Sequence, residues 1–215
     1  MHYRNLGRAG LRVSEICLGT MTFGNGADQD GATKMVNAAL DAGLTFFDTA
    51  NSYVGGTSET MLGVALKGKR QDAIIASKFF NPMGGRPNDS GNSRLHIKQQ
   101  IEGSLLELRG MAPDGGAVSE RDQGRASFSA YQPQYSLVVR DIDEEIVPAQ
   151  TALRWVMDQP FMTSAIVGAR NAEQLSETLG AGGWRLPDAA LEKLNKVSKQ
   201  PHRYPRSFED PMPER

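Results

Sequence analysis

The chain has 215 residues, of which 39% are hydrophobic and 23% are charged, and its formal net charge at pH 7 is -1. This length suits one domain with a substantial core, and the near-neutral charge argues against a nucleic-acid partner, which usually requires a basic face. No apolar run approaches the roughly eighteen residues of a membrane span, and the polar start MHYRNLGRAG lacks a signal-peptide pattern. The single cysteine, Cys17, cannot form an internal disulfide and lies in an apolar stretch. We therefore expect a buried thiol in a cytoplasmic protein.

The first half of the chain alternates short apolar strands with amphipathic helices. Residues 3–16 predict a hairpin that turns between Gly7 and Gly10. The strands predicted next cover residues 16–19, 44–50 and 73–79, and helices are predicted around 32–42, 58–67 and 96–108. In the last of these helices, Ile97, Ile101, Leu105 and Leu108 lie in line.

The alternation breaks in the second half, because residues 109–127 contain no convincing strand. A strand is predicted at 127–134, and a short acidic helix at 141–149 runs directly into another helix at 151–159. The chain then continues with a predicted strand at 163–169 and two helices, at 171–179 and 187–199. These patterns predict five core strands, whereas a closed barrel of the usual kind needs eight.

Strands that alternate with helices imply a parallel sheet, either doubly wound or closed into a barrel. No G-x-G-x-x-G motif follows any predicted strand, so the usual dinucleotide fingerprint of the doubly wound fold is missing. Polar residues instead follow separate strands, at Gly19-Thr20-Met21, Asp48 and Lys78. This distribution favours a TIM (β/α)8 barrel, in which catalytic groups gather at one rim.

Asp48 and Lys78 each close an apolar strand, and Tyr53 follows in the loop above the same rim. A charge at such a place is costly unless it is paired, so we expect an Asp48–Lys78 ion pair. An ammonium beside a phenol stabilises the phenolate, which would make Tyr53 a proton donor to a carbonyl oxygen. The alternative is structural: Asp48 caps a turn, Lys78 faces solvent and Tyr53 is a half-buried loop residue.

A second candidate site lies in the segment IVGARNAEQL (166–175). A strand ends at Gly168, Arg170 follows, and Asn171 can cap the next helix with Gln174 as its partner in a capping box. A free helix N-terminus beside an arginine, after the last strand, suits a phosphate group. The alternative is an ordinary capped surface helix with a solvated arginine.

Together these stretches closely resemble the aldo-keto reductases, which are NADPH-dependent (β/α)8-barrel oxidoreductases. The resemblance covers most of the chain, and its segments occur in the family's order. They are LGRAGLRVSEICLGTMTFG (6–24), TFFDTANSYVGGTSETMLG (45–63), IIASKF (74–79), SAYQPQYSLVVRDIDEEIVPA (129–149) and ALRWVMDQPFMTSAIVGARNAEQLSETLGA (152–181).

The resemblance implies the reduction of aldehydes or ketones to alcohols with NADP(H). Of the family's catalytic tetrad of Asp, Tyr, Lys and His, it assigns Asp48, Tyr53 and Lys78. For the nicotinamide end of the cofactor it assigns Gly19, Thr20, Met21 and Gln132. For the adenosine end it assigns Gly168, Arg170 and Gln174, with Arg170 facing the 2'-phosphate.

The family's tetrad histidine, at the end of barrel strand 4, has no counterpart among His2, His96 and His202. Barrel strands 4, 5 and 7 are also missing, with a Ser-Asn motif and an aromatic-Ser-Pro-Leu segment that bind cofactor. The losses fall near residues 110–119 and 149–150 of what we expect to be one domain over 1–215. Either internal parts of a longer active enzyme are not included in the 215 residues, or the chain is a truncated or engineered variant. Three functions stay open: a carbonyl reductase, a regulatory NADP(H)-binding barrel with impaired catalysis, and a relic that neither binds nor reacts.

Overall fold

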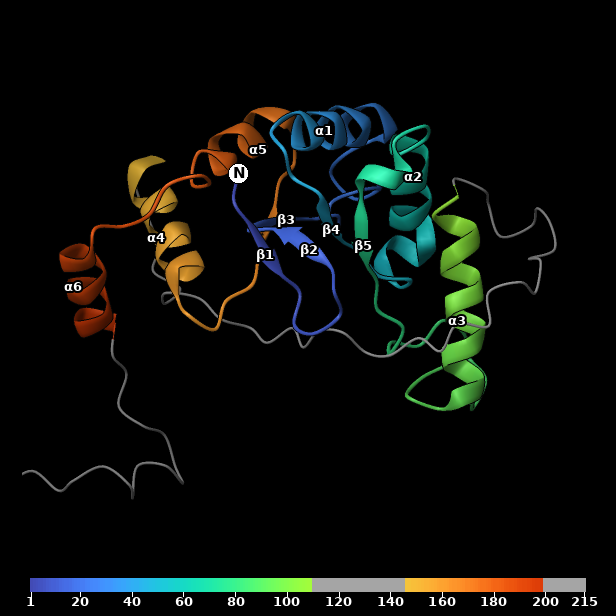
Figure 1. The fold of residues 1–215 in the computed structure, drawn as a ribbon. Helices are drawn as coiled ribbons and strands as arrows, with labels where there is room; N and C mark the ends of the chain where they lie inside the picture. Colours follow the sequence, from blue (N-terminus) through green and yellow to red (C-terminus); the bar gives the residue numbers. More distant parts are fainter. Residues whose placement is uncertain (110–145, 199–215) are drawn as a thin grey trace, which may run out of the picture.

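A four-stranded parallel sheet forms the centre of the computed structural model, which describes residues 1–109 and 146–198 (Figure 1). Its strands follow the order β5-β4-β3-β6. They are β3 (Ile16–Gly19), β4 (Phe46–Asp48), β5 (Ile74–Ala76) and β6 (Ala165–Gly168). A separate antiparallel hairpin consists of β1 (Tyr3–Asn5) and β2 (Arg12–Ser14). These elements confirm the predicted hairpin and four of the five predicted core strands, while the fifth, at 127–134, lies outside the described residues.

The helices form an arc around the sheet, in which neighbours contact one another in the order α3, α2, α1, α5, α4 (Figure 1). Short 3-10 turns, η1 (Tyr53–Gly56) and η2 (Arg70–Asp72), connect the elements of the first half. The helices are α1 (Gln29–Asp41), α2 (Thr57–Ala65), α3 (Arg94–Glu107), α4 (Ile146–Asp158), α5 (Ala172–Leu179) and α6 (Asp188–Ser198). None of the helices within the described ranges is both long and apolar enough to cross a membrane.

The helix arrangement distinguishes a barrel from a doubly wound sheet. The strand order alone would suit both folds, because a doubly wound sheet also places a later strand beside the first one. In that fold, however, the helix after the later strand would lie on the opposite face. Here α5, which follows β6, packs against α1, which follows β3. The helices of the two strands therefore share one face, as the outer ring of a TIM barrel requires.

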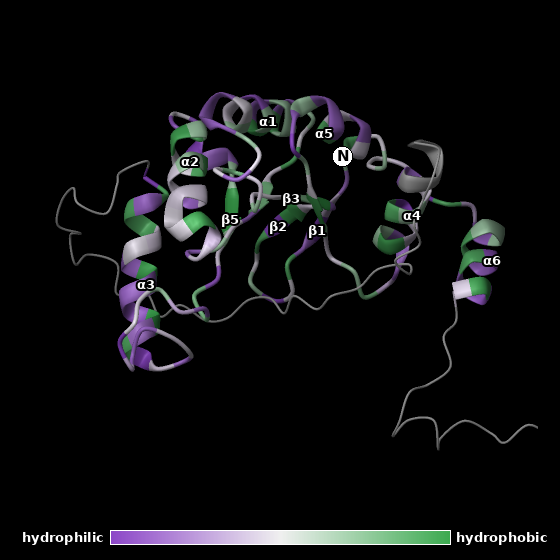
Figure 2. Ribbon diagram, turned by 180° about the vertical axis from the view of Figure 1, so that it is seen from behind, coloured by the Kyte–Doolittle hydropathy of each residue, from purple (hydrophilic) through white to green (hydrophobic). Residues whose placement is uncertain are grey.

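Side chains alternate between the two faces of the sheet. Ile16, Leu18 and Phe47 point toward the helices and join the main core with buried residues of α1 and α2. Cys17 and Phe46 point to the other face and pack with Val13 of the hairpin. The expected buried thiol is confirmed, since Cys17 has no exposed surface and its burial raises the pKa of the thiol. In Figure 2 the strands β3 and β5 of the parallel sheet carry mainly the apolar colour, whereas the helices carry both colours.

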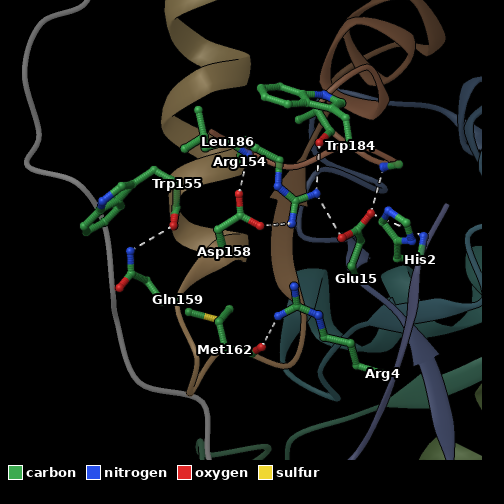
Figure 3. A network of polar contacts seen from close by, with 12 residues as sticks. His2, Arg4, Glu15, Arg154, Trp155, Asp158, Gln159, Met162, Trp184 and Leu186 are labelled. Atoms are coloured by element: carbon green, nitrogen blue, oxygen red, sulfur yellow. Dashed lines mark hydrogen bonds and ion pairs between the residues drawn. The ribbon is translucent and has the colours of Figure 1, made fainter. Parts of the chain in front are cut away.

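A buried ionic network ties α4 to the sheet and to the segment after α5 (Figure 3). Arg154, which is fully buried, donates to Glu15 Oε2 and to Asp158 Oδ1, both at 2.9 Å. Glu15 also accepts bonds from the backbone N–H groups of His2 and Gly183. Burial opposes ionisation of Glu15, but these backbone bonds and the Arg154 guanidinium hold the pKa of the carboxyl below its usual value. The network joins parts of the chain that are more than 130 residues apart.

Two local predictions differ from the structure. The predicted helix junction at 149–150 lies inside one continuous helix, α4, in which Pro148 occupies the first turn, where proline is tolerated. In α3, the apolar row is partly exposed: Ile101 is 40% and Leu105 46% accessible. The helix instead buries a polar side, which includes Glu107, because that side faces α2 and the neighbouring loop.

Candidate active site

The carboxyl ends of the four strands meet at one rim, where most of the predicted site residues lie. In the strand register, Gly168 of β6 pairs with Gly19 of β3, and Gly19 pairs with Asp48 of β4. Asp48 pairs in turn with Ala76 of β5, two residues before Lys78. Predicted residues from four separate strands or strand ends are therefore neighbours, as the barrel hypothesis requires.

Asp48 and Lys78 form a close ion pair. Lys78 Nζ lies 2.6 Å from Asp48 Oδ2 and also donates to the backbone carbonyl of Thr49 at 3.0 Å. Burial raises the pKa of the Asp48 carboxyl, although Lys78 opposes this effect. Burial alone would lower the pKa of the Lys78 ammonium, but the bond and charge of Asp48 raise it above its usual value. Lys78 therefore stays protonated at neutral pH and is not a solvated surface lysine.

Tyr53 completes the group through Lys78. Lys78 Nζ donates to the Tyr53 hydroxyl oxygen at 3.1 Å and lies 4.9 Å from the centre of its ring. The loop that holds Tyr53 is unusual, because Val54, Gly55 and Gly56 all have positive φ angles. A β-branched residue such as Val54 rarely adopts this conformation, so the backbone beside Tyr53 is strained. The predicted meeting of the three side chains is confirmed, while their catalytic role stays a prediction.

The residues predicted at the nicotinamide end do not all face the rim in the same way. Gly19 forms a side-by-side pair with Gly168, which was predicted at the adenosine end. A Cβ on Gly168 would meet nothing within 4 Å, whereas one on Gly19 would lie 3.0 Å from Ile166 Cγ2. Thr20 is buried, and its hydroxyl bonds to the Asp48 carbonyl and to Ser58 Oγ. Met21, in contrast, is 67% exposed. The glycine pair and Met21 therefore offer a surface for a flat ring, whereas Thr20 supports the rim from below.

The residues predicted at the adenosine end lie around the N-terminus of α5. Asn171 caps the helix, since its side chain accepts from the Gln174 N–H at 2.8 Å. The expected capping box is shifted by one residue, because Gln174 Oε1 accepts from the N–H of Arg170 and not of Asn171. The Arg170 and Gln174 side chains are both exposed. First-turn N–H groups of a helix have no acceptor within it, so this end suits an anion.

The remaining predicted residue, Gln132, lies outside the described residues. The histidines do not supply the missing tetrad member in the part of the chain that the structure describes. His96 is buried, and its Nε2 atom lies 2.8 Å from the Phe79 carbonyl oxygen. His2 lies at the Arg154 network, on the hairpin side of the sheet (Figure 3). Within residues 1–109 and 146–198, no group of three or more metal-ligating side chains is found.

Sequence reasoning missed several residues beside the site. Ser58 and Glu59 open α2 and are fully buried below the rim. Ser77, which precedes Lys78, donates to Glu59 Oε1 at 2.5 Å. Glu107 at the end of α3 is also buried. A serine and a glutamate in the first helical turn after a glycine loop suggest capping residues, but in the structure Ser58 bonds to Thr20 and Glu59 accepts from Ser77 instead. The sequence gives no signal that Glu107 approaches them.

Comparisons with known proteins agree with this geometry. The sequence matches the Aldo/keto reductase family over residues 15–115 and 143–199. The chain belongs to this family, whose members are TIM barrels, and the four-stranded sheet with its helices is part of such a barrel. Family membership supports an oxidoreductase function in general.

The curated relatives include one protein named as an oxidoreductase and two named as channel subunits. A protein of Arabidopsis thaliana, "Probable voltage-gated potassium channel subunit beta", is 40% identical over 206 residues, which cover 94% of this chain and 55% of the relative. A protein of the same name from Oryza sativa subsp. japonica is 43% identical over 113 residues, or 50% of this chain and 34% of the relative. "Uncharacterized oxidoreductase YrpG" of Bacillus subtilis (strain 168) is 41% identical over 121 residues, or 51% and 37%. The chain thus spans between about a third and about half the length of these relatives.

Proposed function

We propose that this chain carries the NADP(H)-binding rim and the proton-donating group of a carbonyl reductase, which converts aldehydes or ketones to alcohols. The observation that carries the proposal is the pair of bonds from Lys78 Nζ, one to Asp48 and one to the Tyr53 hydroxyl. A structural ion pair would need only the first bond. The second connects an ammonium whose pKa Asp48 raises to a phenol at the rim, where a substrate can reach it.

The three residues have distinct parts in the proposed reaction. Tyr53 gives its proton to the carbonyl oxygen of the substrate as negative charge develops there. Lys78, held protonated by Asp48, stabilises the phenolate that remains, because it already bonds to the Tyr53 oxygen. Asp48 is 4% exposed and fixes the position of the Lys78 ammonium through a short bond. NADPH, when bound, supplies the hydride that the carbonyl carbon accepts.

The residues around the rim fit a dinucleotide of this kind. The Gly19–Gly168 pair leaves a surface without side chains next to Asp48, which a planar ring can approach closely. The N-terminus of α5 and the exposed Arg170 follow directly after Gly168 and suit a phosphate. One continuous stretch of rim, from β4 through β3 to β6, would therefore hold the cofactor from the nicotinamide to the adenosine end.

The missing histidine limits the proposed turnover. The sequence has no histidine in the tetrad position, so no imidazole is available to orient the substrate carbonyl. Loss of one positioning or proton-transfer group commonly costs a factor of roughly 10² to 10⁴ in rate. We therefore expect slow reduction by the 215-residue chain.

The test mixes protein of verified mass with NADPH and 4-nitrobenzaldehyde. The oxidation of NADPH is monitored by its absorbance. We expect a slow, NADPH-dependent reaction that Tyr53→Phe abolishes. The matched control is Tyr3→Phe, because the exposed Tyr3 hydroxyl bonds to the Gly43 carbonyl, outside the proposed site. Equal rates for wild type and Tyr53→Phe would remove Tyr53 from the reaction.

A second candidate function is a regulatory NADP(H)-binding barrel with little or no turnover. The absent tetrad histidine favours it, and two relatives are named as probable potassium channel β-subunits. Cofactor titration followed by fluorescence distinguishes the two: tight NADPH binding with no product at any substrate concentration supports the regulatory function.

We also propose that residues 1–215 form one barrel-type domain and that the protein is cytoplasmic. The first proposal rests on the shared core of the two described segments, and the second on the single buried cysteine.

A further inference from the structure

Two glutamates are buried against each other behind the proposed active site. Glu59 of α2 has no exposed surface, and Glu107 at the end of α3 is 8% exposed. The Glu107 carboxyl lies against Gly56, which immediately precedes α2, so the two carboxyl groups are neighbours at the start of this helix. The Oε2 atom of each is buried without a hydrogen-bond partner, while Glu59 Oε1 accepts from Ser77 Oγ. Within residues 1–109 and 146–198, neither carboxylate forms an ion pair, so two ionised groups would be uncompensated by the described residues.

The pair touches both segments that carry the proposed catalytic residues. A Cβ atom added to Gly56, three residues after Tyr53, would overlap the Glu107 carboxyl group, so this group lies directly on the loop backbone. Ser77, which bonds to Glu59, immediately precedes Lys78 in the chain. The glutamate pair thus connects the Tyr53 loop, the end of β5 and α3.

Among the described residues, the nearby ionisable groups leave a shared proton as the way to satisfy the two carboxyl groups. From α2, the facing ionisable group is Glu59 itself. Near the end of β5, the ionisable group closest in sequence is Lys78, whose ammonium is already bonded to Asp48, and in η1 it is Tyr53, which bonds to Lys78. Burial, with the Glu59 carboxyl as the second cause, raises the pKa of Glu107 to about 8. Two nearby carboxyls cannot both ionise cheaply, so one keeps a proton and donates it to the other.

We propose that Glu59 and Glu107 share one proton and that this acid pair is a positioning element, which fastens the Tyr53 loop and the end of β5 to α3. The strained loop at Val54 needs such support, since three consecutive residues there have positive φ angles. The effect on catalysis rests on the proposed function, whereas the shared proton and the fastening do not.

The shared proton makes the fastening sensitive to pH, and the sign follows from proton linkage. Glu107 binds its proton more tightly in the folded chain than in the unfolded chain. Between the unfolded pKa and about 8, the folded state therefore holds more protons, so its stability falls as pH rises through this window. Above it, both carboxylates are ionised and repel each other, which loosens α3 and the Tyr53 loop.

The experiment compares urea unfolding of the wild type and of Glu107→Gln at about pH 6 and about pH 9. The glutamine amide can donate to Glu59 at any pH, so the urea midpoint of Glu107→Gln should change little with pH, while that of the wild type should fall. The matched control is Glu102→Gln on the same helix, where the exposed glutamate forms only an i,i+4 pair with Lys98. It should keep the wild-type pH dependence. An equally steep fall in Glu107→Gln would overturn the proposal.

A second measurement needs no variant to fold. Infrared difference spectra of wild-type protein with ¹³C-labelled glutamate, recorded at about pH 6.5 and about pH 9, detect the carboxylic acid stretch of a protonated glutamate. We expect one buried acid band that disappears at the higher pH. Its absence at the lower pH would refute the shared proton. If reduction is detected, its rate should decline at alkaline pH in the wild type but persist in Glu107→Gln. If only this expected pH dependence of the rate were not observed, the effect of the pair on catalysis would be refuted, but the shared proton would not.

Discussion

Replacement of Arg154 by leucine tests how far the fold depends on its buried charges. Arg154 is fully buried and bonds to Glu15 and Asp158, so the substitution leaves these two carboxylates in the interior without the cation that bonds to them (Figure 3). Removal of one member of a buried ion pair typically costs about 3–5 kcal/mol. Since a domain is stable by only about 5–15 kcal/mol, this loss is a large fraction of the total.

Chemical or thermal unfolding followed by circular dichroism measures the loss. A decrease of this size corresponds to a fall in Tm of about 6–20 °C for a chain of this length. The decrease should be smaller at acid pH, because protonation of Glu15 removes the uncompensated charge that the variant must bury. The control is Lys98→Ala, which removes an exposed pair with a separation of 3.8 Å and should cost under about 1 kcal/mol. An Arg154→Leu protein within about 1 kcal/mol of the wild type would refute this view of the network.

Three further predictions concern the proposed site. Arg170→Ala should weaken NADPH binding by roughly one to two decades, for a lost charged contact of about 1.5–3 kcal/mol, but should leave NADH binding nearly unchanged. Fluorescence titrations measure both affinities, and the control is Arg8→Ala, at an exposed turn of the hairpin. Equal losses of NADPH and NADH affinity in Arg170→Ala would show that Arg170 does not contact the phosphate. Lys78→Met should lower the reduction rate by roughly 10² to 10⁴, since it removes the donor to Tyr53, and an unchanged rate would contradict the assigned role. Gly56→Ala should lower the free energy of unfolding, measured with urea, by about 1–3 kcal/mol. The reason is that Gly56 has a φ angle of +91° and that the Glu107 carboxyl group fills the space for a Cβ. A variant as stable as the wild type would argue against this loop geometry.

The sequence predicts elements whose pattern depends on neighbours in the chain. The strand 16–19 and the helix with Ala32, Met35 and Val36 follow from apolar spacing, and the structure confirms both. The meeting of Asp48 and Lys78 was predictable for a similar reason, because residues that end adjacent parallel strands must lie at the same edge.

Features that depend on tertiary packing were not predictable in this way. Periodicity marks Ile101 and Leu105 as buried, but the neighbours of α3 contact its polar side instead. The partner of Arg154 is 139 positions away, and the partner of Glu59 lies on another helix. No local pattern encodes such pairs. Likewise, Thr20 lies between the rim residues Gly19 and Met21 in the sequence. Only the structure shows that its hydroxyl bonds to Ser58, below the rim.

The central claim is that this rim binds NADPH and that Tyr53 donates the proton in carbonyl reduction. The most direct test incubates the purified 215-residue protein with NADPH deuterated at both C4 positions and with 4-nitrobenzaldehyde, and analyses the alcohol by mass spectrometry. Because the label accumulates with time, the method detects even slow turnover. We expect 4-nitrobenzyl alcohol with one deuterium on the carbinol carbon, formed by the wild type and by Tyr3→Phe but not by Tyr53→Phe. Absence of labelled alcohol with the wild type would refute the proposed reduction, and its undiminished formation by Tyr53→Phe would refute the role of Tyr53 as proton donor.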